Sequence, residues 1–295
     1  MRVAKALLIA KKTPLTTLRQ THARDAKKFK KLLEAGHASV KSFERAHDEH
    51  AESLKIVRRE LRSQGVKFSE RNSPPSKPIS GVDLVICVGG DGTLLRASHA
   101  VRNSIPVLGV NSAPAYSVGF LTCCRAPTFA RRLDDLASDR ITPLEIQRLV
   151  VRVGRRRIPE PVLNDVLFCH DNPAVTTRYR ILTPEGEELQ RSSGIWIATP
   201  AGSTAAIRSA GGTALPLTDT RFEYIVREPY APPGSTVELT GGILDAKERL
   251  AVECRSQSAS IYIDGSHRSY KVPFGTKVSF TLTNRPLRLV AHARS

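Results

Sequence analysis

The stretch Val82–Ala100 reads VDLVICVGGDGTLLRASHA and changes character in its middle. Its first half is apolar and rich in β-branched residues, which is typical of a buried strand. Apolar residues then recur at helical spacing, which predicts a helix from about Thr93. Between them stand Gly89, Gly90, Asp91 and Gly92. A strand that runs through a glycine turn into a helix is typical of an anion site, because glycines let backbone N–H groups approach phosphate oxygens.

The aspartate is the unusual member of this turn. The two common phosphate-binding patterns, G-x-x-x-x-G-K-[ST] and G-x-G-x-x-G, are both absent from it. A carboxylate beside bound phosphates is unfavourable unless it holds Mg²⁺ or accepts a proton from an attacking hydroxyl. The alternative is that Asp91 is an ordinary turn or helix-capping residue. The turn therefore supplies Asp91 as a candidate catalytic residue and four candidate phosphate-binding residues: Gly89, Gly90, Gly92 and Thr93.

Strands and helices alternate on both sides of this stretch. The apolar run at 2–10 reads as a buried first strand rather than a signal peptide, because it is short, interrupted by charge and lacks a cleavage site. Helices are expected at 21–36 and about 43–64, and IPVLGVN at 105–111 is another buried strand. This alternation predicts an α/β nucleotide domain over residues 1–137, with a Rossmann-like parallel sheet covered by helices.

The residue pattern changes from about Ile141, where alternating strand and helix patterns give way to short strand patterns. Short β-branched runs such as RLVVRVG, PVLNDVLFC, GIWIAT and KVSFTLT follow one another, with turn residues between them. Such a series predicts an all-β second domain, over residues 138–280.

Composition restricts the partners. The net charge of +17, from 45 basic and 28 acidic residues, attracts polyanions such as a nucleotide, a dinucleotide, polyphosphate or nucleic acid. Aromatic residues are only 5% and no basic motif is interleaved with them, so we expect no nucleic-acid partner. No apolar run reaches the ~20 residues of a membrane span, so we expect no membrane segment. The five cysteines form no C-x-x-C pair, which favours reduced thiols in the cytoplasm and no metal site held by the protein alone.

Several motifs in order carry a family resemblance. VGGDGTLLRASH resembles the signature of the NAD kinase family, although weaker forms occur in diacylglycerol kinases and phosphofructokinases. NSAPAYSVGFLT, VLNDVLF, TPAGSTAAIRSAGG and IYIDG then match later family motifs, and together they cover about Val3 to Leu289. Asp165 stands where glutamate is usual, Ser193 in RSSG stands where an aspartate is common, and Ala206 replaces a tyrosine. The last two departures, with VREP and IYIDG, are similar to the plant-type NADH kinase branch.

The resemblance implies a fold and a reaction. The C-terminal segment, about 281–295, would return to the first domain, and the substrate would lie between the domains. The enzyme would use ATP with Mg²⁺ or another divalent cation to phosphorylate the adenosine ribose 2′-hydroxyl of NADH or NAD⁺, giving NADP(H). Inorganic polyphosphate stays open as the donor. The family is usually dimeric or tetrameric, so a homodimer or homotetramer is expected.

The resemblance also implies roles for individual residues. Asp91 would orient the ribose hydroxyl and accept its proton. A neutral Ser193 near the nicotinamide ring would favour NADH, because an aspartate there would favour the cationic ring of NAD⁺. The residues implied to bind substrate are Gly92, Asn164, Asp165, Arg191, Ser193, Thr204, Ala205, Ala206 and Ser209.

Other functions were weighed against this one. A kinase of a lipid or another small-molecule hydroxyl would use the same Gly-Gly-Asp-Gly turn, but the order of the later motifs argues against it. A basic nucleic-acid-binding protein without activity is a third class, recognised by salt-dependent binding to DNA or RNA without ATP turnover. A serine hydrolase is excluded, because PAGST does not form the G-x-S-x-G nucleophile turn.

Overall fold

The computed structural model describes residues 1–20, 31–32, 34–35 and 37–291. Most of the helix expected at 21–36 lies outside these residues. Two compact units are present: Met1–Leu144 with the chain from Arg288 onward, and Glu145–Leu287. These divisions lie at 145 and 288 rather than at 138 and 281. The later C-terminal division follows from β18 (Lys277–Leu282), which pairs with β7 and β15 inside the second unit.

A largely parallel sheet forms the centre of the first unit. Its strand order is β2-β1-β3-β4-β19-β6, with β5 paired beside β4. The pairings of β1 with β2 and β3, and of β4 with β3, β5 and β19, are all parallel. The strands are β1 (Lys5–Ala10), β2 (Lys67–Arg71), β3 (Leu84–Gly89), β4 (Val107–Asn111), β5 (Cys124–Arg125), β6 (Leu144–Ile146) and β19 (Leu287–Val290). The expected α/β class is confirmed.

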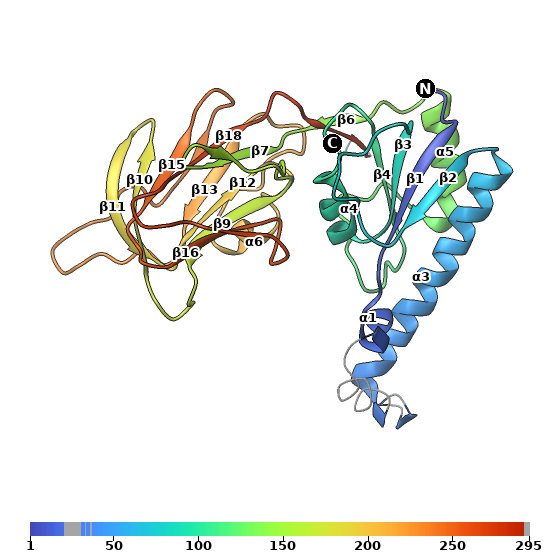
Figure 1. Ribbon diagram of the computed structural model, residues 1–295, viewed down its shortest axis with the longest axis horizontal. Helices are drawn as coiled ribbons and strands as arrows, with labels where there is room; N and C mark the ends of the chain where they lie inside the picture. The colour runs from blue at the N-terminus through green and yellow to red at the C-terminus, as the bar shows by residue number, and fades with distance from the viewer. Residues whose placement is uncertain (21–30, 33, 36, 292–295) are drawn as a thin grey trace. The chain divides into compact units, whose positions relative to one another are not determined.

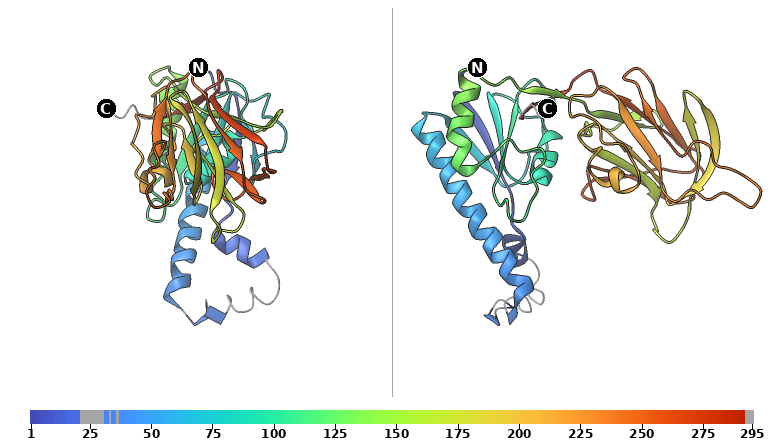
Figure 2. Two further views of the ribbon diagram at one scale, coloured as in Figure 1. Left: turned by 90° about the vertical axis from the view of Figure 1, so that its left-hand side faces the viewer. Right: turned by 180° about the vertical axis from the view of Figure 1, so that it is seen from behind.

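Helices cover both faces of this sheet. Figure 1 shows α4 on one face and α3 and α5 on the other, and the view from behind in Figure 2 agrees. Buried apolar residues of α3, such as Val57 and Leu61, pack with Leu8 and Ile86 of the strands. None of the helices in the described part of the chain is long and apolar enough to cross a membrane. The helices are α1 (Pro14–Gln20), α3 (Ala38–Ser63), α4 (Asp91–Ser98), the 3₁₀ turn η1 (Ala126–Thr128) and α5 (Phe129–Ala137).

One edge strand was not expected. The polar segment 69–80 reads as a loop, but β2 extends to Arg71 and pairs with β1. Most of β2 is exposed and only Phe68 is half-buried, so the segment has no apolar alternation that would mark it as a strand.

The second unit is a sandwich of two antiparallel sheets. Their strand orders are β11-β10-β15-β18-β7-β8 and β14-β13-β12-β9-β16-β17. One apolar core lies between them, with Tyr179 and Val252 from the first sheet and Phe168 and Ile197 from the second. The expected β-rich class is confirmed. The remaining elements are β7 (Leu149–Val153), β8 (Arg156–Arg157), β9 (Asp165–His170), β10 (Thr177–Thr183), β11 (Gly186–Ser192), β12 (Ile195–Ala198), α6 (Ala206–Ser209), β13 (Phe222–Val226), β14 (Gly241–Leu244), β15 (Leu250–Cys254), β16 (Ala259–Ile263) and β17 (Ser269–Lys271).

Candidate functional site

The glycine turn of the first unit is tightly packed. β3 ends at Gly89, Gly90 precedes the helix, and α4 begins at Asp91 rather than at Thr93. A side chain on Gly89 would collide with Oγ1 of Thr93, and one on Gly90 would collide with Oγ of Ser117. A side chain at Gly89 or Gly90 would therefore force Thr93 or Ser117 to move, whereas Gly92 is exposed and faces open space.

Asp91 is held by a neighbouring loop. Its Oδ2 accepts the N–H of Phe120 at 2.8 Å, and its Oδ1 accepts the N–H of Leu121 at 2.7 Å. The carboxylate also lies in the first turn of α4, where the helix dipole favours a negative charge. Each oxygen keeps a further lone pair, because an ionised carboxylate has about four acceptor sites. Asp91 thus has an architectural role and retains the capacity to accept a proton.

The carboxyl ends of three parallel strands meet at this turn. Lys11 follows β1 and donates its N–H to Val88 at 2.9 Å, while Ser112 follows β4 and donates to Gly89 at 3.3 Å. A Cβ on Gly89 would lie 3.1 Å from Cβ of Lys11. A lysine stem therefore begins directly beside the turn.

Helix α3 braces the end of β4 with a buried histidine. Nδ1 of His50 lies 2.8 Å from Oγ of Ser112, and Oγ of Ser53 donates to the Ser112 carbonyl at 3.0 Å. Burial, and after it the charge of Lys11, lowers the pKa of His50 to about 4. His50 is consequently neutral near pH 7 and serves as a hydrogen-bonding brace.

In the second unit, a carboxylate organises the turn that precedes β9. Asp264 accepts the N–H groups of Leu163, Asn164 and Asp165 at 3.0, 2.7 and 3.2 Å. Its own N–H donates to the Asp165 carbonyl at 3.0 Å, and its φ of 48° is in the left-handed region. These bonds fix the backbone from which Asn164 and Asp165 project.

The Asn164 side chain carries an unsatisfied acceptor, and the neighbouring Asp165 side chain is buried. Oδ1 of Asn164 is buried and has no hydrogen-bond partner among the described residues. The carboxyl of Asp165 is only 6% exposed, and its pKa is raised to about 7, first by burial and then by the charge of Asp264. A buried acceptor without a partner costs about 1–3 kcal/mol, so such groups favour a polar ligand.

The glycine-rich segment packs against the same turn. The N–H of Thr199 donates to the Asn164 carbonyl at 2.9 Å, and a side chain on Gly202 would collide with the Asn164 backbone. The implied substrate residues follow at once: Thr204, Ala206 and Ser209 are exposed, and Ala205 is the half-buried residue before α6. The structure thus places this segment beside Asn164 and Asp165.

Two implied substrate residues lie elsewhere in the second unit. Ser193 precedes β12 and Thr199 follows it, so about 20 Å of extended chain separates them. Arg191 is exposed on β11, opposite Arg178 of β10 in the other sheet. Neither residue is brought to Asn164 within this unit.

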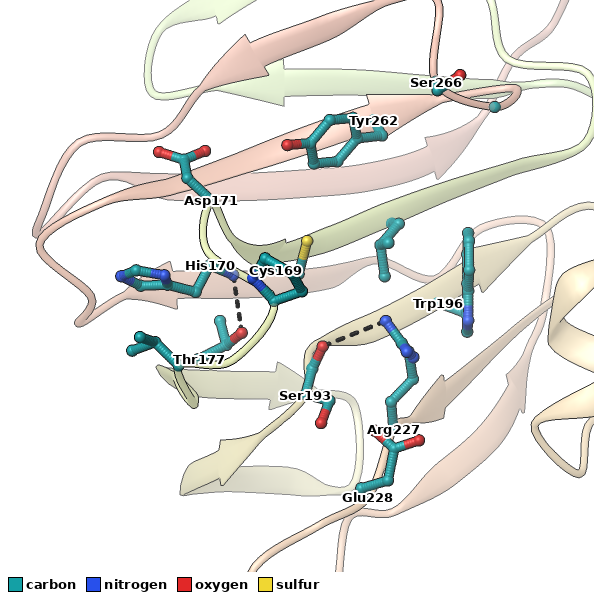
Figure 3. Close-up of a pocket in the computed structure, with 14 residues that line it drawn as sticks. Cys169, His170, Asp171, Thr177, Ser193, Trp196, Arg227, Glu228, Tyr262 and Ser266 are labelled. Carbon is teal, nitrogen blue, oxygen red and sulfur yellow. Dashed lines mark hydrogen bonds between the residues drawn. The ribbon is translucent and has the colours of Figure 1, made fainter.

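Ser193 instead lines a cavity of about 610 Å³ on the outer face of its sheet. Figure 3 shows Trp196 and Tyr262 in this cavity, with Arg227 beside Ser193. The Arg227 guanidinium lies 5.9 Å from the centre of the Trp196 ring, and its Nη1 donates to the Ser193 carbonyl at 3.4 Å. Ser193 therefore lies in a cavity lined by aromatic rings and by charges of both signs: Arg227, Glu228 and Asp171.

Asp264 and Arg148 are two site residues that were not predicted from the sequence. Asp264 lies in the IYIDG motif, which was the available signal. Arg148 is 1% exposed, and its Nη2 donates to the Arg285 carbonyl at 2.7 Å. Burial lowers its pKa to about 10, while the charge of Asp264 acts in the opposite direction. The charge of Arg148 thus stabilises Asp264, but an isolated arginine in a strand-rich segment gives no sequence signal.

Comparisons with known proteins agree with this architecture. Residues 16–141 match the family model of the ATP-NAD kinase N-terminal domain. A probable NADH kinase from Oryza sativa subsp. japonica is 36% identical over 77% of this chain and 76% of its own. An NADH kinase from Arabidopsis thaliana is 32% identical over 79% and 80%.

Two solved structures share the fold. An NAD kinase from Archaeoglobus fulgidus in complex with ATP has a TM-score of 0.70 at 18% identity, over 97% of this chain and 93% of that one. Yeast NADH kinase complexed with NADH also has a TM-score of 0.70, at 19% identity over 99% and 84%. The resemblance in the sequence motifs is confirmed: the chain belongs to the NAD kinase family and is a phosphotransferase.

Proposed function

We propose that this protein is an NAD(H) kinase that transfers the γ-phosphoryl group of ATP to the adenosine ribose 2′-hydroxyl of NADH or NAD⁺. Relatives named NADH kinase and structural neighbours that bind ATP or NADH support this assignment. The observation that carries it is the turn at Asn164 and Asp165, where a buried amide oxygen has no hydrogen-bond partner among the described residues and lies beside a buried carboxyl.

We assign the phosphate donor to the glycine turn of the first unit. The N–H groups at the start of α4, with Gly89, Gly90, Gly92 and Thr93, would contact its phosphates. Asp91 would orient the ribose hydroxyl and accept its proton as transfer proceeds, which is typically worth about 10²–10⁴ in rate.

We assign the dinucleotide to the second unit. Oδ1 of Asn164 would accept from a ribose hydroxyl or the adenine amine, and the carboxyl of Asp165 would bind a second hydroxyl. Thr204, Ala205, Ala206 and Ser209 would contact the same molecule. Arg191 on β11 and Ser193 just before β12 would contact the nicotinamide end of the dinucleotide, on the condition that the molecule extends that far from Asn164.

The residues present fit a Mg²⁺ ion that arrives with the nucleotide. No cluster of three His, Cys, Asp or Glu side chains that could hold a metal occurs within residues 1–20, 31–32, 34–35 and 37–291. Mg²⁺ commonly binds through one or two carboxylates and substrate phosphates, and Asp91 is the only carboxylate in the turn. Such an ion would neutralise phosphate charge.

The oligomeric state and the cellular compartment are the last two parts of the proposal. We infer a homodimer or homotetramer, supported by a half-buried row of Tyr262, Leu167, Trp196 and Ile225 across the outer face of one sheet. The five free cysteines support a reducing compartment such as the cytoplasm.

The test is purified protein with Mg-ATP and either NADH or NAD⁺, scored for NADPH or NADP⁺. Parallel reactions with inorganic polyphosphate would identify the donor, and reactions with lipid hydroxyls would examine the alternative kinase. Formation of a phosphorylated lipid without NADP(H) would overturn the proposal.

A further inference from the structure

The glycine turn contains no cation of its own. Residues 89–93 are three glycines, a threonine and Asp91, whose charge repels phosphate. Both Asp91 oxygens bind the Phe120 and Leu121 amides, so these two N–H groups are not available to a ligand. A nucleotide triphosphate bound at this turn stays anionic even with one Mg²⁺ ion, so a positive side chain from a neighbouring element would stabilise it further.

Lys11 is positioned to be that side chain. It continues β1 next to β3, where Ala10 pairs with Val88, and its N–H donates to the Val88 carbonyl. Figure 1 shows the two strands side by side. The 3.1 Å spacing between its Cβ and a Cβ built on Gly89 places the start of the lysine stem on the same side of the sheet as the side chain of Thr93.

The surroundings of Lys11 leave its charge uncompensated. No salt bridge to Lys11 occurs in the part of the chain that the structure describes. The ionisable groups that feel its charge include His50, which Lys11 and His47 both disfavour in the protonated form. Lys11 thus adds a positive charge beside the turn, where it opposes the negative charge of Asp91 and can attract a polyanion.

We propose that Lys11 binds the terminal phosphates of the nucleotide donor and replaces the lysine that other phosphate-binding turns carry within their own motif. His50 and Ser53 are positioning residues for the glycine turn. Both side chains contact Ser112, and the Ser112 N–H donates to the Gly89 carbonyl. This inference deepens the proposed function and rests on ATP binding at the glycine turn.

The experiment measures Mg-ATP affinity by calorimetry on the full chain. Lys11→Met keeps the length of the stem and removes the charge, Lys11→Arg keeps the charge, and Lys12→Met is the matched control at an exposed neighbour. Loss of a charge-assisted contact should weaken ATP binding about ten- to a hundredfold in Lys11→Met. The other two variants should stay within about threefold of wild type, and the KM for NADH should change less than about twofold in all three.

Three results would overturn the inference: ATP affinity unchanged in Lys11→Met, an equal loss in Lys12→Met, or an equal loss in Lys11→Arg at an unchanged melting temperature. The proposed function fails separately. A protein that binds ATP through Lys11 but does not phosphorylate NADH or NAD⁺ would retain the inference and lose the function. Formation of NADPH by a protein whose ATP affinity is unaltered in Lys11→Met would retain the proposed function and overturn the inference about Lys11.

Discussion

Oδ1 of Asp91 accepts the N–H of Leu121 at 2.7 Å, so the carboxylate in the glycine turn also anchors a loop 30 residues further along the chain. The other oxygen binds the adjacent amide of Phe120. A carboxylate accepts both bonds, whereas an asparagine would turn its NH₂ group toward one of the two donors. Chemistry and architecture are therefore combined in a single side chain.

We expect Asp91→Asn to lose about 10²–10⁴ in turnover, because the proton acceptor is removed. The variant should also lose about 1–3 kcal/mol of stability from one unsatisfied amide. Steady-state kinetics and thermal melts would be measured together.

Asp83→Ala is the matched control for that experiment. Oδ2 of Asp83 accepts the N–H groups of Ala4 and Lys5, so its removal also frees two backbone donors, but away from the glycine turn. It should lower the melting temperature and leave turnover nearly intact. Equal turnover losses in the two variants would reduce Asp91 to a purely structural residue.

We expect Asn164→Ala to raise the KM for the dinucleotide about 5- to 150-fold while the KM for ATP changes little. The reason is that Oδ1 of Asn164 has no partner in the described protein and is available to the ligand. Its loss should not lower the melting temperature. Asn111→Ala provides the contrast, because both ends of the Asn111 amide are bonded, to Ser117 and Ala113. If Asn164→Ala lowers the melting temperature as much as Asn111→Ala does, the Asn164 side chain stabilises the fold and is not kept free for the ligand.

Features that are determined by contiguous residues could be predicted from the sequence, and features that depend on distant contacts could not. The strand, glycine turn and helix around Asp91 follow from contiguous residues, as do the two fold classes. The hydrogen bond that the Asn164 N–H donates to Asp264 joins residues 100 positions apart, and no local pattern predicts such pairing. The packing of Ser193 beside Trp196 and Arg227, rather than beside Asn164, depends on strand register, which the sequence alone did not specify.

We expect the stability of the wild-type protein to fall between about pH 4 and pH 7 relative to Asp165→Asn. The folded protein raises the pKa of Asp165 to about 7, so it binds this proton more tightly than the unfolded chain, whose aspartate pKa is about 3.9. The stabilisation is complete below about pH 4 and is lost as the pH rises toward 7. The free energy of unfolding of Asp165→Asn, relative to that of the wild type, should therefore rise by up to about 4 kcal/mol between pH 4 and pH 7.

Denaturant melts at pH 4.5, 6 and 8 would measure this difference. Asp219→Asn supplies a control of opposite sign, because a hydrogen bond from Arg221 lowers the pKa of Asp219. That variant should lose stability relative to wild type as the pH rises through the acidic range. A pH-independent difference between wild type and Asp165→Asn would mean that Asp165 titrates normally.

We expect wild-type protein to prefer NADH to NAD⁺, and Ser193→Asp to shift that preference toward NAD⁺. NAD⁺ carries a positive nicotinamide ring, and an aspartate about 8 Å away would stabilise it by about 2 kcal/mol at an effective dielectric constant of about 20. That energy corresponds to roughly 30-fold in selectivity. Arg227 lies beside Ser193, so a new aspartate would pair partly with its guanidinium, and the measured shift should be smaller.

Arg227 lies over Trp196, but Glu228 and Asp171 line the same cavity, so the existing charges of both signs leave position 193 as the one that is varied. Ser193→Asn is the control, since it adds similar bulk without charge. The measurement is the ratio of kcat/KM for NADH and NAD⁺ in the wild type and both variants. An unchanged ratio in a folded, active Ser193→Asp protein would place the nicotinamide ring beyond the reach of Ser193. A shift shared by Ser193→Asn would assign the preference to pocket shape rather than to charge.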